Sequence, residues 1–146
     1  MTNAEKKGCA SVERRLVTTL EAIDGVCSDL RDGVLGEIPQ SERFPVELML
    51  REALTNAVRH GLGGDPKGAV CCEIECLCGG VALRISDSGD GFPWREQLDG
   101  TPASLAESGR GLRILSLYAD ALRFNEAGNR VEIIRMFNKG SENGDF

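Results

Sequence analysis

The sequence predicts an α+β protein, a two-layer α/β sandwich in which helices cover one face of a mixed, mostly antiparallel sheet. Apolar residues at helical spacing dominate the first half of the chain, and strand-like runs joined as hairpins dominate the second half. The chain has 146 residues, 41% hydrophobic and 27% charged, which suits one domain with its own core. We therefore expect a single domain over residues 11–138, with flexible tails at 1–10 and 139–146.

The first half of the chain is expected to hold one strand and two helices. Residues 11–18 suit a strand, and apolar residues recur at helical spacing over residues 19–35. A connection is expected over residues 36–44. Pro45 then suits the first position of the second helix, where a backbone N–H is not needed. Gly61 is expected to end that helix as its C-cap.

The second half is expected to hold two hairpins and one helix. The four strands are expected over residues 69–78, 81–87, 121–125 and 130–137. Gly79-Gly80 is a two-residue turn signal between the first two strands. Residues 88–108 are long and irregular, and a helix is expected to follow from residue 111 or 112 to about residue 119.

The charge balance and the apolar runs exclude several classes of partner. The net charge is −6 and the sequence pI is about 4.9, which argues against nucleic acid and anionic lipid as main partners. No window approaches the roughly 20 apolar residues of a membrane span. The first seven residues are polar and do not resemble a signal peptide. We therefore expect a cytoplasmic protein that binds neither nucleic acid nor membrane.

The cysteines are expected to be reduced and to hold no metal. They are Cys9, Cys27, Cys71, Cys72, Cys76 and Cys78. The last four lie in a strand-like run whose alternation places Cys72, Cys76 and Cys78 on one face and Cys71 on the other. Their spacing lacks a C-x₂-C pair and no histidine is near, so buried strand residues are favoured over a metal site.

A first polar motif lies on the second expected helix. Glu52, Asn56 and His60 are four residues apart, so on an α-helix they share one face. A carboxylate beside a carboxamide is suited to hold Mg²⁺ and to orient a nucleophile. A solvated helix face would carry the same residues, and the motif alone favours that simpler interpretation.

Two glycine motifs follow, and each alone is weak. Asp87 ends an apolar strand and precedes Gly89 and Gly91. Its carboxylate can accept a hydrogen bond from the exocyclic amine of a base, and the two glycines allow the backbone to approach the flat ring of that base closely. An ordinary turn would have the same composition. The third motif comprises Gly109, Arg110, Gly111 and Leu112 at the start of a helix, where N–H groups and a cation suit phosphate. A plain loop and cap would also fit.

The motifs E-x-x-x-N-A-x-x-H, D-x-G-x-G-F and G-R-G-L together resemble the ATPase superfamily shared by gyrase, heat-shock chaperones, histidine kinases and mismatch-repair ATPases. The absence of a Walker A motif fits this resemblance. Within the superfamily, residues 45–137 resemble bacterial anti-sigma factors that are serine/threonine protein kinases. The resemblance implies ATP and Mg²⁺ as cofactors, a sigma factor and an anti-sigma factor antagonist as protein partners, and a homodimer.

The resemblance also implies a role for each motif position. Glu52 would be the catalytic base, Asn56 would coordinate Mg²⁺, and His60 would close the helix end beside the phosphates. The other positions would bind ATP: Asp87 at the adenine amine, Gly89 and Gly91 around the ring, and Gly109, Arg110, Gly111 and Leu112 at the phosphates. One departure concerns Asn129, which stands where the family usually has a threonine that helps to bind adenine.

Three other functions are alternatives to a kinase. A complete sensor histidine kinase needs a phosphoacceptor histidine on a preceding hairpin, and the one histidine is His60. A gyrase-type ATPase needs a further transducer domain, for which 146 residues leave no space. An adaptor that binds nucleotide without phosphotransfer stays open, although Glu52 and Asn56 favour a working kinase.

Overall fold

The helices and strands are taken from a computed structural model, which describes residues 11–61, 68–88 and 108–137. In chain order they are β1 (Val12–Val17), α2 (Ala22–Asp32), the 3₁₀ turn η1 (Val34–Glu37), α3 (Gln40–Asn56), the π-helical turn η2 (Ala57–Gly61), β2 (Val70–Leu77), β3 (Gly80–Asp87), α5 (Ser108–Tyr118), β4 (Ala121–Phe124) and β5 (Arg130–Met136).

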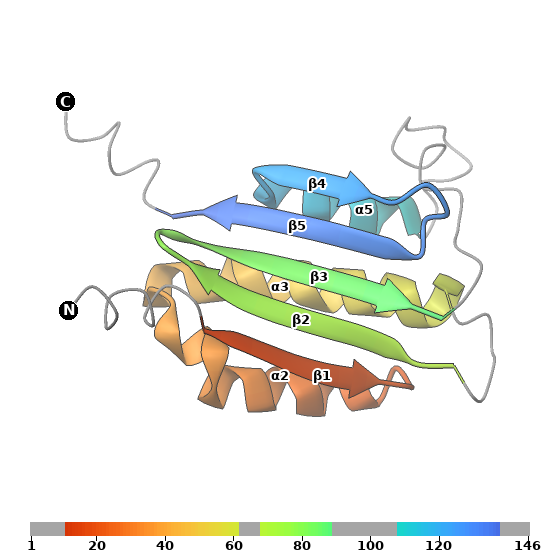
Figure 1. Cartoon of the computed structure of the whole chain (residues 1–146), viewed down its shortest axis with the longest axis horizontal. Helices are drawn as coiled ribbons and strands as arrows, with labels where there is room; N and C mark the ends of the chain where they lie inside the picture. Colours follow the sequence, from red (N-terminus) through yellow and green to blue (C-terminus); the bar gives the residue numbers. More distant parts are fainter. Residues whose placement is uncertain (1–10, 62–67, 89–107, 138–146) are drawn as a thin grey trace.

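The strands form one sheet in the order β1-β2-β3-β5-β4, and each neighbouring pair is antiparallel. Helices α2, α3 and α5 lie on one face of this sheet, and among residues 11–61, 68–88 and 108–137 no helix covers the other face (Figure 1). The predicted two-layer α+β sandwich is therefore confirmed. The closing hairpin of β4 and β5 also forms where the sequence predicts it.

The core lies between the sheet and the helices. It is one buried cluster that includes Leu30 of α2, Leu50 and Leu54 of α3, Leu83 of β3 and Ile133 of β5. Burial alternates strictly along β2, so Cys72, Ile74 and Cys76 face the helices as their spacing predicts. Burial of these apolar side chains is the main contribution that holds the two layers together.

Helix α3 begins earlier than the sequence predicts. It starts at Gln40, after Pro39 as N-cap, and Pro45 lies inside the helix instead of at its first position. The backbone N–H of Glu42 donates to the Pro39 carbonyl at 2.9 Å, which closes the first turn. An interior proline costs the helix one hydrogen bond, and Pro45 is itself buried in the core, where packing compensates for that loss.

The turn between β2 and β3 is shifted by one residue from its predicted position. Leu77 pairs with Gly80, so the two turn residues are Cys78 and Gly79, and Gly79 has a φ of +80°. Gly80 instead starts β3. A Cβ atom at Gly80 would lie 2.6 Å from the Met136 sulfur and 2.7 Å from the Arg135 carbonyl, so close packing against β5 requires glycine there.

The shifted turn also corrects one expectation about the cysteines. Cys78 lies beyond the end of β2, is exposed, and is disulfide-bonded, so neither its predicted burial nor its predicted reduced state holds. Cys27, Cys71, Cys72 and Cys76 are free thiols. Within the described ranges, no three His, Cys, Asp or Glu side chains are grouped to hold a metal ion.

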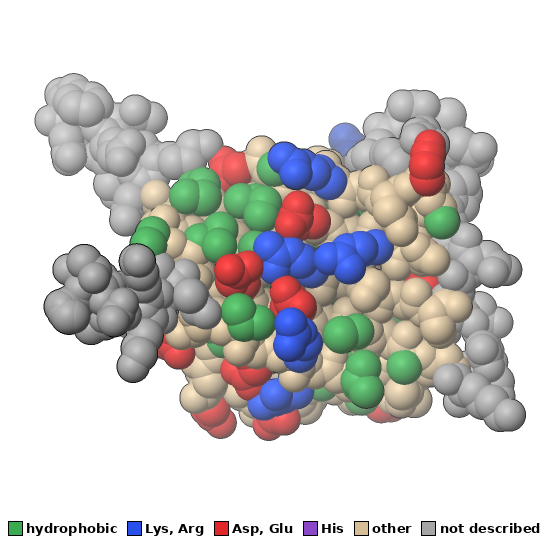
Figure 2. All heavy atoms as spheres, in the orientation of Figure 1, with side chains coloured by type: hydrophobic (Ala, Val, Ile, Leu, Met, Phe, Trp, Pro, Cys, Tyr) green, Lys and Arg blue, Asp and Glu red, His purple; other side chains and the backbone are tan. Residues whose placement is uncertain are grey.

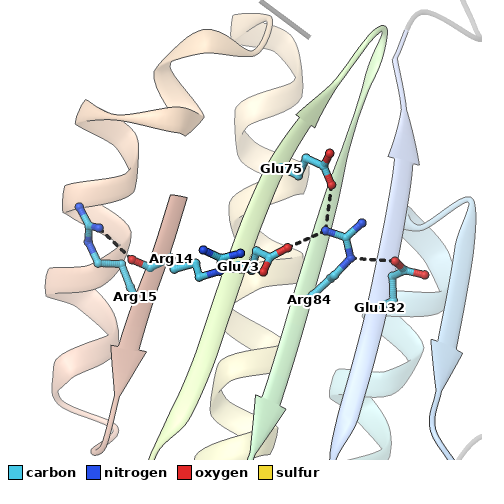
Figure 3. Close-up of polar contacts among 6 residues, drawn as sticks. All are labelled: Arg14, Arg15, Glu73, Glu75, Arg84 and Glu132. Carbon is cyan, nitrogen blue, oxygen red and sulfur yellow. Dashed lines mark hydrogen bonds and ion pairs between the residues drawn. The ribbon is translucent and has the colours of Figure 1, made fainter. Parts of the chain in front are cut away.

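The uncovered face of the sheet carries a band of arginine and glutamate side chains with apolar areas on both sides (Figure 2). Arg84 of β3 is at its centre and donates to Glu73, Glu75 and Glu132 at 2.8, 2.9 and 2.9 Å (Figure 3). Arg14 of β1 extends the network to Glu73 at 2.9 Å. Partial burial opposes the charge of Arg84, but these hydrogen bonds raise its pKa above the ordinary value.

Candidate functional site

Four segments meet at one end of the sandwich: the end of α3, the end of β3, the start of α5 and the turn between β4 and β5 (Figure 1). A small cavity of about 20 Å³, partly open to solvent, lies among them. Its lining residues are Ala53, Asn56, Ala57, Ile85, Asp87, Leu115, Phe124, Gly128, Asn129, Arg130 and Val131. The cavity thus combines apolar walls with a few polar groups, as small-molecule sites do.

Asn56 brings a buried amide to the cavity. The residue is 9% exposed, and its Nδ2 atom is the one buried side-chain nitrogen or oxygen without a hydrogen-bond partner among the described residues. A buried amide left unpaired costs about 1–3 kcal/mol. This cost is offset when a polar ligand or water binds there, so the Asn56 amide indicates a binding site for a polar group.

The backbone of α3 changes at Asn56. The N–H of Ala57 is shared between the carbonyls of Ala53 and Leu54, and residues Ala57–Gly61 then form a π-helical turn. Such turns are rare and occur frequently at functional sites. His60 lies in this turn, so it does not continue the α-helical row of Glu52 and Asn56 that the sequence predicts. The His60 side chain lies outside the described part of the structure.

Glu52 lies one helical turn before Asn56 and is partly buried. It is not among the cavity-lining residues. The i, i+4 spacing on α3 nevertheless places Glu52 on the same side of the helix as Asn56. The structure therefore brings Asn56 to the cavity, and Glu52 lies one turn closer to the start of α3.

Asp87 is the last residue of β3 and lines the cavity opposite α3. Its backbone N–H donates to the carbonyl of Asn129 at 2.9 Å, which attaches the end of β3 to the β4–β5 turn. Asn56 and Asp87 are distant in the sequence and meet here as the sequence predicts. Gly89 and Gly91 lie outside the described residues, so their expected place around the ligand stays a prediction.

The third motif lies inside helix α5 rather than before it. The helix begins at Ser108, so the backbone of Gly109, Arg110, Gly111 and Leu112 forms its first turns. Two glycines lower helix propensity, and packing of Leu115 and of α5 against α3 compensates for it. The first N–H groups of a helix lack intrahelical acceptors and suit an anion. The side chains of residues 108–112 lie outside the described part.

Several cavity residues carry no functional signal in the sequence. Ile85, Leu115, Phe124 and Val131 have the spacing of ordinary core residues on their own strands or helix. They become walls of a cavity only where α5 and the β4–β5 hairpin pack over the end of α3. Gly128 has a φ of +82°, which favours glycine, but a turn alone would explain that glycine.

The comparisons with known proteins decide the family. Residues 16–135 match the histidine kinase-like ATPase domain. The chain belongs to this family. The matched range lies within the expected domain of residues 11–138, whose ends stay a prediction. A histidine kinase domain from the Erythrobacter litoralis EL346 blue-light activated histidine kinase shares the fold, with a TM-score of 0.57 and 17% identity over 84% of this chain and 63% of that one.

Relatives of this histidine kinase-like ATPase domain include proteins named anti-sigma F factor. The one from Geobacillus stearothermophilus is 34% identical over 83 residues, which are 54% of this chain and 57% of that protein. The one from Clostridium botulinum strain Eklund 17B is 30% identical over 100 residues, 64% of this chain and 70% of that protein. The chain thus spans little more than half the length of the first of these relatives.

Family membership implies an ATP-binding domain, and the cavity residues fit that ligand. Apolar walls suit a flat base, and Asp87 offers an acceptor at one end. Mg²⁺ is usually held by one or two protein ligands together with substrate phosphates, so a single amide from Asn56 also fits. None of the helices in the described ranges is long and apolar enough to cross a membrane.

Proposed function

We propose that this chain is an ATP-dependent serine/threonine protein kinase that acts as an anti-sigma factor in a bacterial partner switch in the cytoplasm. It would phosphorylate an anti-sigma factor antagonist and bind a sigma factor, as a homodimer. The observation that carries the proposal is the cavity that gathers Asn56 and Asp87, with Glu52 one helical turn away. Family membership and the anti-sigma F factor relatives support it.

Different residues at this end of the sandwich bind different parts of ATP. Asp87 accepts a hydrogen bond from the amine of the base, and Gly89 and Gly91 shape the loop beside the ring. Ile85, Leu115 and Phe124 exclude water from the faces of the ring. The backbone N–H groups at the start of α5 bind the phosphates together with Arg110, as the third motif predicts.

Asn56 and Glu52 carry the step that transfers the phosphoryl group. Asn56 would hold Mg²⁺, and this ion would neutralise part of the charge of the phosphates. Glu52 accepts the proton of the incoming serine hydroxyl and orients its oxygen toward the γ-phosphorus. The phosphorus–oxygen bond to ADP breaks as the bond to the serine oxygen forms. Because phosphoryl transfer depends on positioning and charge stabilisation, this small set of groups suffices.

The proposal is tested with γ-labelled ATP, Mg²⁺ and a candidate antagonist protein. Glu52→Gln should keep ADP affinity within a few-fold and lose transfer of label by at least roughly 10²-fold, the scale of a positioned base. Asn56→Ala should lose both nucleotide affinity and transfer of label, because the Mg²⁺ ligand is removed. Glu37→Gln is the matched control, since Glu37 is exposed and does not line the cavity.

Full transfer by Glu52→Gln would refute the role of this residue. Tight ATP binding by the wild type without label on any antagonist would instead favour an adaptor without kinase activity. Light scattering after size exclusion tests the homodimer.

A further inference from the structure

The disulfide bond of Cys78 has one possible partner within the chain. Cys78 is exposed at the turn between β2 and β3 and is disulfide-bonded. The sequence contains six cysteines, of which four are free thiols: Cys27, Cys71, Cys72 and Cys76. The sixth is Cys9. Because Cys9 lies outside the described residues, its pairing with Cys78 needs support from the strands that are described.

The register of β1 with β2 supplies this support. The two strands pair without a bulge, so each residue back along β1 matches one residue forward along β2. Just before β1, the carbonyl of Ser11 accepts the backbone N–H of Cys76 at 2.8 Å, as the same register requires. Two further steps bring position 9 opposite Cys78. Opposite residues of antiparallel strands have Cα atoms about 4.5–5.5 Å apart, within the roughly 4.4–6.8 Å that a disulfide spans.

A bond at this place would hold an edge of the sheet. Strand β1 pairs with β2 alone, and the ends of such strands open easily because few contacts hold them. The side chain of Glu13 in β1 also accepts the N–H of Val34 at 2.9 Å, so the position of β1 is coupled to the start of η1. A link from position 9 to Cys78 closes a loop of about 70 residues that contains β1, α2, α3 and β2.

We propose that Cys9 and Cys78 are a redox-modification site, a reversible disulfide that fixes the start of β1 to the β2–β3 turn. A small disulfide such as oxidised glutathione supplies the oxidising equivalents. The Cys78 thiolate attacks this disulfide, forms a mixed disulfide and releases one glutathione thiolate. The Cys9 thiolate then attacks the Cys78 sulfur and releases the second. Two protein thiols are thus oxidised while one small disulfide is reduced to two thiols.

The exposure of Cys78 makes the bond reversible. An exposed disulfide is accessible to small thiols and is reduced more readily than a buried structural one. The free thiols nearby differ in this respect, since Cys72 and Cys76 are buried between the sheet and the helices. Oxidants of low molecular weight should therefore act on Cys78 and leave these two thiols unchanged.

The bond is tested first by its effect on stability. Wild-type protein oxidised with oxidised glutathione should melt about 10 °C higher than the same protein in dithiothreitol, the scale of a link across a loop of this length. Cys9→Ser and Cys78→Ser should each abolish this difference, and the double variant should behave as either single one. Cys71→Ser is the matched control and should retain it, because Cys71 is a free thiol.

Hydrogen exchange separates a local link from a general gain in stability. The amide of Cys76 donates to Ser11, two residues after Cys9. Reduction should speed exchange of this amide by about tenfold, as the start of β1 opens. The amide of Asp87, at the far end of β3, should exchange at the same rate in both forms. Equal rates for the Cys76 amide in the oxidised and reduced proteins would contradict the role assigned to the bond.

Peptide mapping without reductant identifies the partner directly. In the oxidised wild type, the peptides that contain Cys9 and Cys78 should be linked, and iodoacetamide should modify Cys78 only after reduction or in Cys9→Ser. A Cys78 linked to another cysteine or to a second copy of the chain would overturn the inference, as would equal melting temperatures with and without dithiothreitol. These readouts need neither nucleotide nor phosphotransfer, so they are independent of the proposed kinase.

Discussion

Replacement of Arg84 by methionine should destabilise the protein by about 2 kcal/mol. Arg84 is 23% exposed and contacts three carboxylates that are 25–28% exposed, at 2.8–2.9 Å (Figure 3). An exposed ion pair contributes ~0.2–1 kcal/mol. Three partly buried pairs, discounted for solvent screening, sum to about 2 kcal/mol. Methionine keeps an apolar chain in place of the Arg84 stem, so the loss of stability measures the contribution of the guanidinium charge and its hydrogen bonds.

Urea unfolding at pH 7 measures this loss, which corresponds to a melting temperature lower by about 6 °C for a domain of this size. Arg123→Met is the matched control. Arg123 is 75% exposed and lies 3.7 Å from Glu132, so its loss should change the free energy of unfolding by less than about 0.5 kcal/mol. If Arg84→Met is as stable as the wild type, the network does not stabilise the sheet and the reasoning is refuted.

The pH dependence gives an independent check. The hydrogen bond from Arg14, and then that from Arg84, lower the pKa of Glu73 from its ordinary value of 4.5. A carboxyl whose folded pKa is depressed contributes stability above its unfolded pKa and loses it as the pH falls through the folded pKa. The stability difference between the wild type and Arg84→Met should therefore narrow below about pH 4.5. A difference that widens in acid would contradict the assignment.

Two further predictions concern the cavity and the thiols. Asp87→Asn should weaken ADP binding and reduce the preference for ADP over GDP, because a charged acceptor for the base amine is replaced by a weaker neutral one and an amide donor is introduced beside it. Calorimetric binding equal to the wild type would show that the base lies elsewhere. Iodoacetamide at pH 7.5 should modify Cys71 before Cys72. Burial raises the pKa of Cys72 to about 11, so little of this thiol is ionised at that pH. Cys71 instead lies on the opposite face of the strand and is only partly buried. Mass spectrometry of the labelled peptides would contradict this by finding Cys72 modified first.

The sequence by itself determined the fold class, and it predicted Asn56 and Asp87, two polar residues that line the cavity. The spacing of apolar residues gave β2 its buried face, and the order of the motifs placed Asn56 on a helix and Asp87 at a strand end. These features are local, because the periods of helix and strand are properties of consecutive residues. The match of residues 16–135 to the histidine kinase-like ATPase domain agrees with the predicted fold class.

Boundaries were decided by packing rather than by local preference. Pro45 lies within α3, and Gly109 and Gly111 lie within α5, although both residue types disfavour a helix interior. Each helix gains more from burial against its neighbours than these residues cost. Cys78 departs from the alternation of the strand because the register of β2 with β3 ends the strand at Leu77.

Only the tertiary structure determined the walls of the cavity. In the sequence, Phe124 and Leu115 have the pattern of ordinary core residues. They line the cavity because α5 and the β4–β5 hairpin pack against α3. The bond from Asp87 to Asn129 joins segments 42 positions apart in the sequence, which the pairing register of β3 with β5 brings together. Local patterns encode how a segment folds, but the register between segments depends on the packing of the whole core.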